Sequence, residues 1–502
     1  MDGAQTPAVP DLVLPGRLDL YYGGAWRAPL RGGRVESRNP GSGEALCDVA
    51  QATPEDIDAA VQAAKAGFKV WRDVAPRERG RILREIAARI RRYGPELAML
   101  DAADSGNPFS EMLGDAEAAA SQVEFFAGLV TEMKGASIPM GPDAVNFSVR
   151  EPLGVIGRIL PFNHPLMFCA GKTAAILAAG NAVVIKPPEQ APLSALRLAE
   201  LAGDLMPAGV FNVLPGGREA AAHLAAHPGV AMVALVGSAA AGRAVMRAAS
   251  DTLKPVLLEL GGKNALIAFP DADPDEVAAG VIAGMNFAWC GQSCGSTSRA
   301  FLHEDIHDQV LERVKALAAR FRPGQPTDPR TTMGAIVSQA QHQRVMRYID
   351  RAKAEGARLV CGGGPPADPA LNGGFFIEPT VFAEVTPDMT IAREEIFGPV
   401  LAVLKWSDAE AMLNQVNAVE YGLTCSIWTN DITTAHRTAA RVEAGFVWVN
   451  EVARHFLGAP FGGYKQSGIG REESVEELFA FTQEKNIHIR LRPAARPPSK
   501  PS

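Results

Sequence analysis

Residues 230–262 read VAMVALVGSAAAGRAVMRAASDTLKPVLLELGG. Two short apolar runs, 230–238 and 256–262, flank a helical segment. Strands that read as continuous Val, Ile and Leu runs and are separated by helices are typical of a parallel sheet with both faces covered. This stretch therefore predicts an α/β fold, and such sheets bind nucleotides at the carboxyl ends of their strands.

The same alternation continues on both sides of this stretch. The expected strands before it are AVVIKP at 182–187 and FNVLPG at 211–216, and the next one after it is NALIAFP at 264–270. A second alternating pattern follows Asp273-Pro274, with apolar runs at 298–304, 358–363, 398–406, 423–429 and 446–451. The pattern predicts a second α/β domain, with a boundary near 262–273.

Length and composition exclude several classes of protein. A chain of 502 residues is too long for one ordinary core, and a net charge of -7 gives no basic footprint for nucleic acid. The six cysteines form no CxxC pair, which fits a reducing compartment. No secretory signal opens the sequence, and no apolar run is long enough to span a bilayer. We expect a cytoplasmic protein without nucleic-acid or membrane partners.

Polar groups at the predicted strand ends are candidates for binding and chemistry. Ser238 could cap the next helix, whose free N–H groups suit a phosphate, although any strand-to-helix turn shares this pattern. Lys186 and Glu189 could bind a ribose diol or form an exposed charge pair. Glu259 lies in an apolar run, where desolvation would raise its pKa toward that of a general base. The alternative is a strand-end carboxylate that reaches solvent.

Two cysteines lie close together in FAWCGQSCGSTSR at 287–299. Cys290 and Cys294 could form a metal clip, a redox pair or a buried pair of thiols, or one of them could be a nucleophile. No second pair of ligands complements them, so we predict no metal site. Cys294 has small neighbours that allow a ligand to approach its sulfur. Cys290 is more simply a structural thiol, and a reversible disulfide with Cys294 is the alternative.

The chain resembles the aldehyde dehydrogenase superfamily over nearly its whole length. The motifs that carry the resemblance follow the family's order: PFNHP at 161–165, KPPE at 186–189, Gly237-Ser238, ELGG at 259–262, GQSC at 291–294, EEIFGPV at 394–400 and PFGGYKQSG at 460–468. Each motif is weak alone, but together they are specific.

The resemblance implies a role for each matching residue. Cys294 is expected to attack the aldehyde carbon to give a thiohemiacetal, and the loss of a hydride then leaves a thioester. The Asn163 side-chain amide and the Cys294 backbone N–H correspond to the oxyanion hole. Glu259 resembles the base that activates water to hydrolyse the thioester. Lys172 aligns with a lysine that supports the site from behind.

The resemblance also implies NAD as the cofactor. Lys186 and Glu189 match contacts to the adenosine ribose, and Gly237 and Ser238 match the contact to the pyrophosphate. Glu395 and Phe397 match contacts to the nicotinamide ribose.

The substrate is predicted to be a small-molecule aldehyde, aromatic or bulky. By alignment the pocket draws on Phe162, His164, Phe168, Gly171, Trp289, Arg454, His455, Phe456 and Phe461. Most of these are aromatic, and Gly171 is expected to widen the channel. Arg454 and His455 are also compatible with an aldehyde that carries a carboxylate. Trp289 is compatible with betaine aldehyde, whose quaternary ammonium could lie against the indole ring. A coenzyme-A-acylating enzyme would also fit the superfamily, although Glu259 argues against it, and so would a catalytically silent member.

By analogy the fold has a Rossmann-like cofactor-binding domain, a second α/β catalytic domain and a small β oligomerisation arm that makes a homodimer or homotetramer. The expected segments are a flexible tail (1–16), the NAD-binding domain (17–132 and 151–262), the catalytic domain (263–450), the arm (133–150 and 485–492), a return segment with the active-site anchor loop (451–484) and a disordered tail (493–502).

Overall fold

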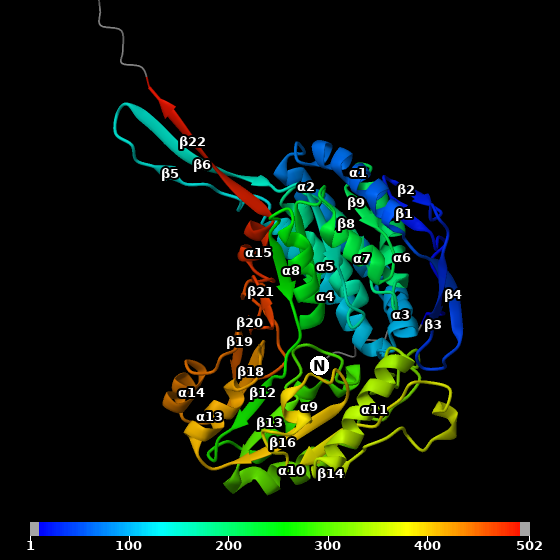
Figure 1. The fold of residues 1–502 in the computed structure, drawn as a ribbon, viewed down its shortest axis with the longest axis vertical. Coiled ribbons are helices and arrows are strands. Elements are labelled where there is room, and N and C mark those ends of the chain that lie inside the picture. The colour runs from blue at the N-terminus through cyan, green and yellow to red at the C-terminus, as the bar shows by residue number, and fades with distance from the viewer. Residues whose placement is uncertain (1–9, 492–502) are drawn as a thin grey trace, which may run out of the picture.

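The computed structural model describes residues 10–491. Residues 1–9 of the expected first tail, residue 492 of the expected arm and the whole expected tail 493–502 lie outside the described residues. Figure 1 shows two α/β bodies, one above the other, and a narrow β arm that projects from the upper body. The mixed architecture confirms the predicted fold class.

The upper body is built on an eight-stranded sheet in the order β2-β1-β9-β8-β7-β10-β11-β21. Strands β9, β8, β7, β10 and β11 are parallel, as the apolar runs predicted. The bounds are β1 Leu20–Tyr22, β2 Ala25–Arg27, β7 Val155–Ile159, β8 Ala182–Lys186, β9 Phe211–Val213, β10 Met232–Val236, β11 Val256–Glu259 and β21 Gly468–Ile469. The chain returns to this sheet late, because β21 pairs antiparallel with the end of β11.

Helices cover both faces of this sheet. Alternate residues of β8 belong to different cores: Val183 and Ile185 pack on one face and Val184 on the other. The helices are α1 Pro54–Trp71, α2 Pro76–Arg92, α3 Gly94–Ser105, α4 Phe109–Gly128, α5 Pro165–Ala178, α6 Leu193–Ala202, α7 Arg218–Ala226 and α8 Ala239–Ser250. The continuous apolar runs are therefore strands with no solvent-facing side.

The lower body holds a seven-stranded sheet in the order β14-β15-β16-β13-β12-β18-β19. All neighbouring strands are parallel except β14 and β15. The bounds are β12 Ala265–Ala268, β13 Arg299–His303, β14 Arg358–Cys361, β15 Thr380–Ala383, β16 Val400–Trp406, β18 Thr424–Trp428 and β19 Phe446–Val449. The main helices are α9 Pro274–Met285, α10 Glu304–Ala318, α11 Gln339–Ala354, α13 Ala409–Asn417 and α14 Ile432–Ala439.

The projecting arm is a three-stranded sheet in the order β22-β6-β5. Its strands are β5 Ser137–Ile138, β6 Ala144–Pro152 and β22 Thr482–Arg490, and β22 pairs with β6 along its whole length. The shorter elements are β3 Arg34–Arg38, β4 Ala45–Ala50, β17 Tyr421–Gly422, β20 Tyr464–Lys465, α12 Thr390–Arg393 and α15 Val475–Ala480. None of the helices between residues 10 and 491 combines the length and the apolar character needed to cross a membrane.

Candidate active site

Three of the four predicted catalytic residues line one cavity of about 300 Å³. Cys294, Glu259 and Lys172 all line it, although they come from a loop after α9, from the end of β11 and from α5. The other lining residues are Asp115, Ala118, Gln122, His164, Met167, Phe168, Val236, Asn286, Trp289, Ser293, Gly295, Trp448, Ala453, His455, Phe461, Glu472 and Glu473. Both α/β bodies therefore contribute to the site.

The loop that carries Cys294 is held by the side chain of Asn264. The Asn264 Nδ2 donates to the carbonyl oxygen of Cys294 at 2.7 Å and to that of Ser296 at 3.0 Å. Gly291 has a φ of +64°, and a Cβ there would lie 2.2 Å from the carbonyl oxygen of Gly398. Close packing and side-chain hydrogen bonds therefore fix the loop, a role for Asn264 that the sequence did not reveal.

The two neighbouring cysteines occupy different environments. Cys294 is half-buried and lines the cavity, whereas Cys290 is 1% exposed and packs in the core of the lower body. Both thiols are free. Burial raises the pKa of the Cys294 thiol to about 12, and Glu259 adds to the shift. An attack by Cys294 therefore needs a group that removes its proton.

Glu259 is buried at the end of β11, with no hydrogen-bond partner among the described residues for its Oε1. Desolvation raises the pKa of this carboxyl well above its usual value, and the negative charge of Glu472 raises it further. The alternative interpretation, in which the Glu259 carboxylate reaches solvent at the strand end, is therefore wrong. A carboxylate with a raised pKa is a stronger base, which suits proton abstraction.

Lys172 joins a buried ionic network behind the cavity. Its Nζ lies 2.9 Å from Glu472 Oε2 and 3.0 Å from Glu473 Oε1. Glu472 also accepts from Arg158 Nη2 at 2.8 Å, and His455 Nδ1 lies 3.0 Å from Glu473 Oε2. Although burial alone would lower the pKa of Lys172, the two carboxylates raise it. Lys172 is thus a permanent cation among carboxylates.

The predicted oxyanion donor Asn163 is buried directly before α5. Its backbone oxygen accepts from Asn107 Nδ2 at 2.9 Å, and no described residue bonds to its side-chain amide. The next turn is fixed because Leu166 N donates to Asp101 Oδ2 at 3.0 Å. The Asn163 backbone is therefore held while its amide stays available.

The predicted cofactor residues lie at the carboxyl ends of the parallel strands of the upper body. Lys186 ends β8, and Gly237 and Ser238 follow β10, where Ser238 Oγ caps α8 by accepting from Ala241 N at 3.2 Å. Burial lowers the pKa of Lys186 to about 8. No ion pair within residues 10–491 joins Lys186 to Glu189, which is exposed. The structure therefore does not contain the exposed charge pair between Lys186 and Glu189 that was the alternative interpretation.

Glu395 and Phe397 approach the same region from the lower body. Glu395 Oε1 accepts from Gly262 N at 3.1 Å, and burial raises the pKa of this carboxyl. The Phe397 ring lies edge-on to that of Phe162, with centroids 5.7 Å apart. Phe162 therefore lies beside Phe397, and it is not among the residues that line the cavity.

The expected pocket residues divide into two groups. His164, Phe168, Trp289, His455 and Phe461 line the cavity. Arg454 pairs with Glu451 at the surface, and Phe456 is 52% exposed, so neither lines it. The expected widening at Gly171 is wrong, because a Cβ there would lie 1.9 Å from Gln122 Oε1 and the Gln122 side chain fills the space.

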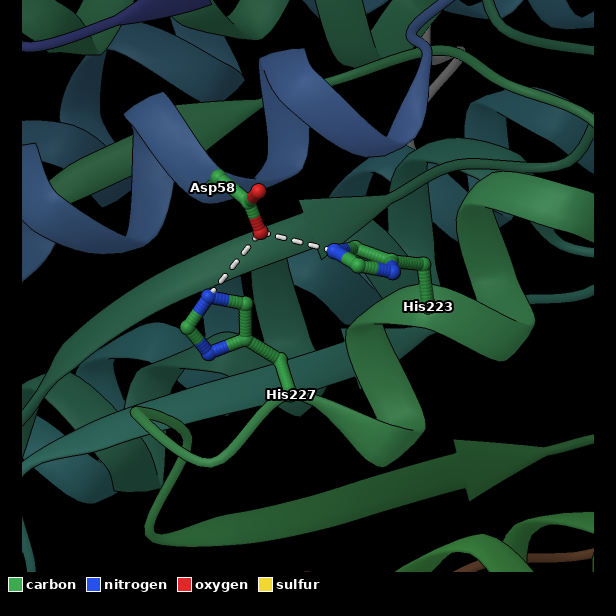
Figure 2. Close-up of side chains that lie close together, drawn as sticks. All are labelled: Asp58, His223 and His227. Carbon is green, nitrogen blue, oxygen red and sulfur yellow. Dashed lines mark hydrogen bonds and ion pairs between the residues drawn. The ribbon is translucent and has the colours of Figure 1, made fainter.

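Away from the cavity, Asp58 of α1 joins His223 and His227 in a group that resembles a metal site (Figure 2). Asp58 Oδ1 lies 2.7 Å from His223 Nε2 and 3.2 Å from His227 Nε2. However, Gly229 N donates to His227 Nδ1 at 2.8 Å, which places the proton of a neutral ring on Nε2. A metal ligand needs that nitrogen unprotonated, so the geometry favours a hydrogen-bonded cluster over an ion site.

Comparisons with known proteins agree with these motifs. The aldehyde dehydrogenase family model matches residues 26–487. Aldehyde dehydrogenase tropH of Talaromyces stipitatus is 51% identical, and the match covers 95% of this chain and 94% of that protein. The betaine aldehyde dehydrogenase of Mesorhizobium japonicum is 40% identical over 95% of this chain and 98% of its own.

A solved structure gives the same overall fold. The indole-3-acetaldehyde dehydrogenase AldA of P. syringae, in complex with NAD+ and IAA, superposes with a TM-score of 0.93. It is 36% identical, and the match covers 96% of this chain and 98% of that one.

Proposed function

The chain belongs to the aldehyde dehydrogenase family, and we propose that it oxidises an aromatic or bulky aldehyde to the carboxylic acid with NAD. The observation that carries this proposal is the meeting of Cys294, Glu259 and Lys172 in one cavity. These residues come from distant parts of the chain, so their convergence reflects the fold. Their chemical types supply a nucleophile, a base and a fixed cation.

In the first step, the Cys294 sulfur attacks the aldehyde carbon after its proton has passed to a base. This proton would pass to solvent, because Cys294 is only half-buried, and Glu259 would stay ionised for the second step. The Asn163 amide and the Cys294 backbone N–H would donate to the oxyanion as it develops. The Asn264 and Asn107 hydrogen bonds keep both donors in place.

The residues at the strand ends fit an adenine dinucleotide. Lys186 is a desolvated cation without a hydrogen-bond partner among the described residues, and Glu189 beside it is an exposed acceptor, so together they would bind the adenosine ribose. Gly237, Ser238 and the start of α8 would hold the pyrophosphate. Glu395 and Phe397 would hold the nicotinamide ribose. When bound, NAD accepts the hydride that the substrate carbon releases.

In the second step, Glu259 would take a proton from water, which then attacks the thioester on Cys294. Before that proton transfer, the Lys172 charge stabilises the ionised form of Glu259, and it also keeps Glu472 and Glu473 ionised. A coenzyme-A-acylating enzyme would not need this base. A silent family member would not need the nucleophile, the base and the oxyanion donor together.

The cavity walls support an aromatic or bulky aldehyde, because Phe168, Trp289, Trp448 and Phe461 line it. The structural relative from P. syringae, an indole-3-acetaldehyde dehydrogenase, agrees with this choice. The second candidate is betaine aldehyde, which the aromatic walls and the relative from Mesorhizobium japonicum favour.

We further propose a homodimer or homotetramer in the cytoplasm. The projecting arm supports self-association, because Ile138, Val145 and Ile489 are apolar and more than 40% exposed on it. The free thiols support a reducing compartment.

The deciding experiment follows the absorbance of NADH while the purified protein is mixed with NAD and a panel of aldehydes. The panel contains benzaldehyde, indole-3-acetaldehyde, betaine aldehyde and acetaldehyde. Carboxylic acid formation without coenzyme A, fastest with an aromatic aldehyde, is expected. No NADH with any aldehyde would refute the proposed function.

A further inference from the structure

The proposed chemistry gives no role to a histidine–aspartate pair in the cavity, whose histidine is more deeply buried than that of the pair of His455 with Glu473. His164 precedes α5, Asp115 lies on α4, and both line the cavity. The His164 Nδ1 lies 2.7 Å from Asp115 Oδ2, and the two side chains are 15% and 9% exposed. A carboxylate at this distance places a proton on Nδ1, because only an N–H can donate to it.

This pairing determines what the other ring nitrogen offers. In a neutral imidazole with its proton on Nδ1, the Nε2 presents a lone pair and accepts a hydrogen bond. No described residue bonds to Nε2 of His164. When His164 is neutral, the cavity therefore contains a fixed acceptor that a bound molecule can satisfy with a donor.

The surroundings of His164 fit a flat ring. Its imidazole lies 5.2 Å from the Phe168 ring and 5.7 Å from the Trp289 ring, measured between centroids. Phe461 and Trp448 line the same cavity. Aromatic rings favour stacked or edge-on contacts with another ring, so the acceptor lies where an aromatic substrate would bind.

We propose that the cavity selects an aromatic aldehyde that bears a ring hydroxyl, with the hydroxyl donating to Nε2 of His164. This inference rests on the proposed function and names the substrate class of that site. A quaternary ammonium aldehyde cannot donate a hydrogen bond to Nε2, and one carboxylate oxygen of Asp115 is already engaged by His164. Asp115 acts as a positioning residue because it selects the tautomer of His164.

The test compares kcat/KM for 4-hydroxybenzaldehyde, 3-hydroxybenzaldehyde, 4-methoxybenzaldehyde and benzaldehyde at a pH where the phenols are neutral. The methoxy compound matches the hydroxyl compound but cannot donate. The unmodified enzyme should prefer at least one hydroxyl compound by about tenfold or more over both references, which is the effect of one satisfied hydrogen bond.

Two variants then assign the preference to the pair. His164→Phe keeps a ring but removes the acceptor, so the hydroxyl preference should disappear. Asp115→Asn can donate its amide to Nδ1, which leaves Nε2 as a donor, so the preference should turn toward the methoxy compound. The matched control His223→Phe, on α7 and outside the cavity lining, should keep the preference of the unmodified enzyme.

The outcomes separate this inference from the proposed function. Oxidation of all four compounds at similar kcat/KM would overturn the inference and leave the function standing, and so would a clear preference for betaine aldehyde. If no aldehyde is oxidised, calorimetric titration with 4-hydroxybenzyl alcohol and benzyl alcohol still decides. Tighter binding of the hydroxylated alcohol, lost in His164→Phe, would support the inference, whereas equal binding would overturn it.

Discussion

Two groups of charged and polar residues differ in their surroundings. One group, the floor of the cavity, is buried, and the other lies at the carboxyl edge of the upper sheet. On the floor, Glu259, Lys172, Glu472 and Glu473 are buried, and the charges of the last three are held by one another. At the edge, Glu189 and Ser238 are exposed, and the Lys186 ammonium has no ionic partner within residues 10–491. The protonation states of the floor residues are therefore set by their protein neighbours. Among the described residues, those at the edge have no such ionic partners and can bind a ligand. Changes on the floor should therefore abolish chemistry, and changes at the edge should alter cofactor choice.

The largest effect is expected for Cys294→Ser. An alkoxide is much harder to form at neutral pH than a thiolate, so aldehyde oxidation should fall to background. The affinity for NAD should be little affected, because Cys294 is not among the residues proposed to contact the cofactor. Activity is measured by NADH absorbance and NAD affinity by calorimetry.

The matched control is Cys290→Ser, which changes a buried thiol outside the cavity lining. This variant should keep its activity. An inactive Cys290→Ser beside an active Cys294→Ser would reverse the assignment of the nucleophile.

Glu259→Gln should slow the release of the acyl group more than its formation. The amide cannot take a proton from water, and general-base catalysis typically contributes about 10²- to 10⁴-fold. A rapid burst of NADH near one equivalent per site, followed by slow turnover, is the expected trace in stopped-flow absorbance. Normal steady-state turnover would move the base to another residue.

The pH profile of the unmodified enzyme checks the same carboxyl. Because burial and Glu472 raise the pKa of Glu259, its basic form is lost as the pH falls while ordinary carboxyls are still ionised. The rate of deacylation should therefore rise with pH through a pKa above the usual carboxyl range. A rate that stays flat down to a pH near 4.3, about the ordinary pKa of glutamate, would contradict the assignment.

Asn163→Ala should lower kcat by roughly 10²- to 10³-fold, the usual loss when one oxyanion donor is removed. The affinity for NAD should change little, because the Asn163 backbone is held by Asn107. Single-turnover measurements give the rate of the chemical step directly. An unchanged rate would exclude the Asn163 amide from the oxyanion hole.

The fold was predictable wherever burial left a local pattern. The run that became β10 contains no charged residue, and its alternate residues pack on opposite faces of the sheet. The run that became β7 was not identified, since Arg158 interrupts it. That arginine is buried because Glu472 pairs with it, a partner so distant in sequence that no local pattern reveals it.

The site shows the same limit. Glu259 could be identified because a carboxylate in an apolar strand is costly and needs a reason. Glu472 and Glu473 follow a Gly-Arg pair in a polar segment, and only their contacts with Lys172 show that they belong to the cavity floor. Gly171 was misinterpreted for a related reason, because the Gln122 side chain that fills its space comes from another helix.

The smallest effect is expected at the edge, from Glu189→Gln. If the Glu189 carboxylate accepts from a hydroxyl of the adenosine ribose, the 2′-phosphate of NADP would place a second negative charge beside it. Repulsion should then favour NAD in kcat/KM. Because Glu189 is exposed, solvent weakens this repulsion, and Lys186 offsets part of it. We therefore expect a preference of at least about tenfold, which corresponds to about 1.4 kcal/mol, and not a complete exclusion of NADP.

Glu189→Gln tests this prediction because it keeps the shape and the hydrogen-bonding oxygen while it removes the charge. The gap between NAD and NADP should narrow, chiefly through better use of NADP, while kcat with saturating NAD stays close to that of the unmodified enzyme. Raising the ionic strength should narrow the gap in the unmodified enzyme but not in the variant, since salt screens a charge that the variant lacks. Equal kcat/KM for the two cofactors in the unmodified enzyme would refute the role of Glu189. A variant whose preference does not move would show that the discrimination comes from another part of the edge, and the contrast between an ion-paired floor and an open edge would then no longer explain cofactor choice.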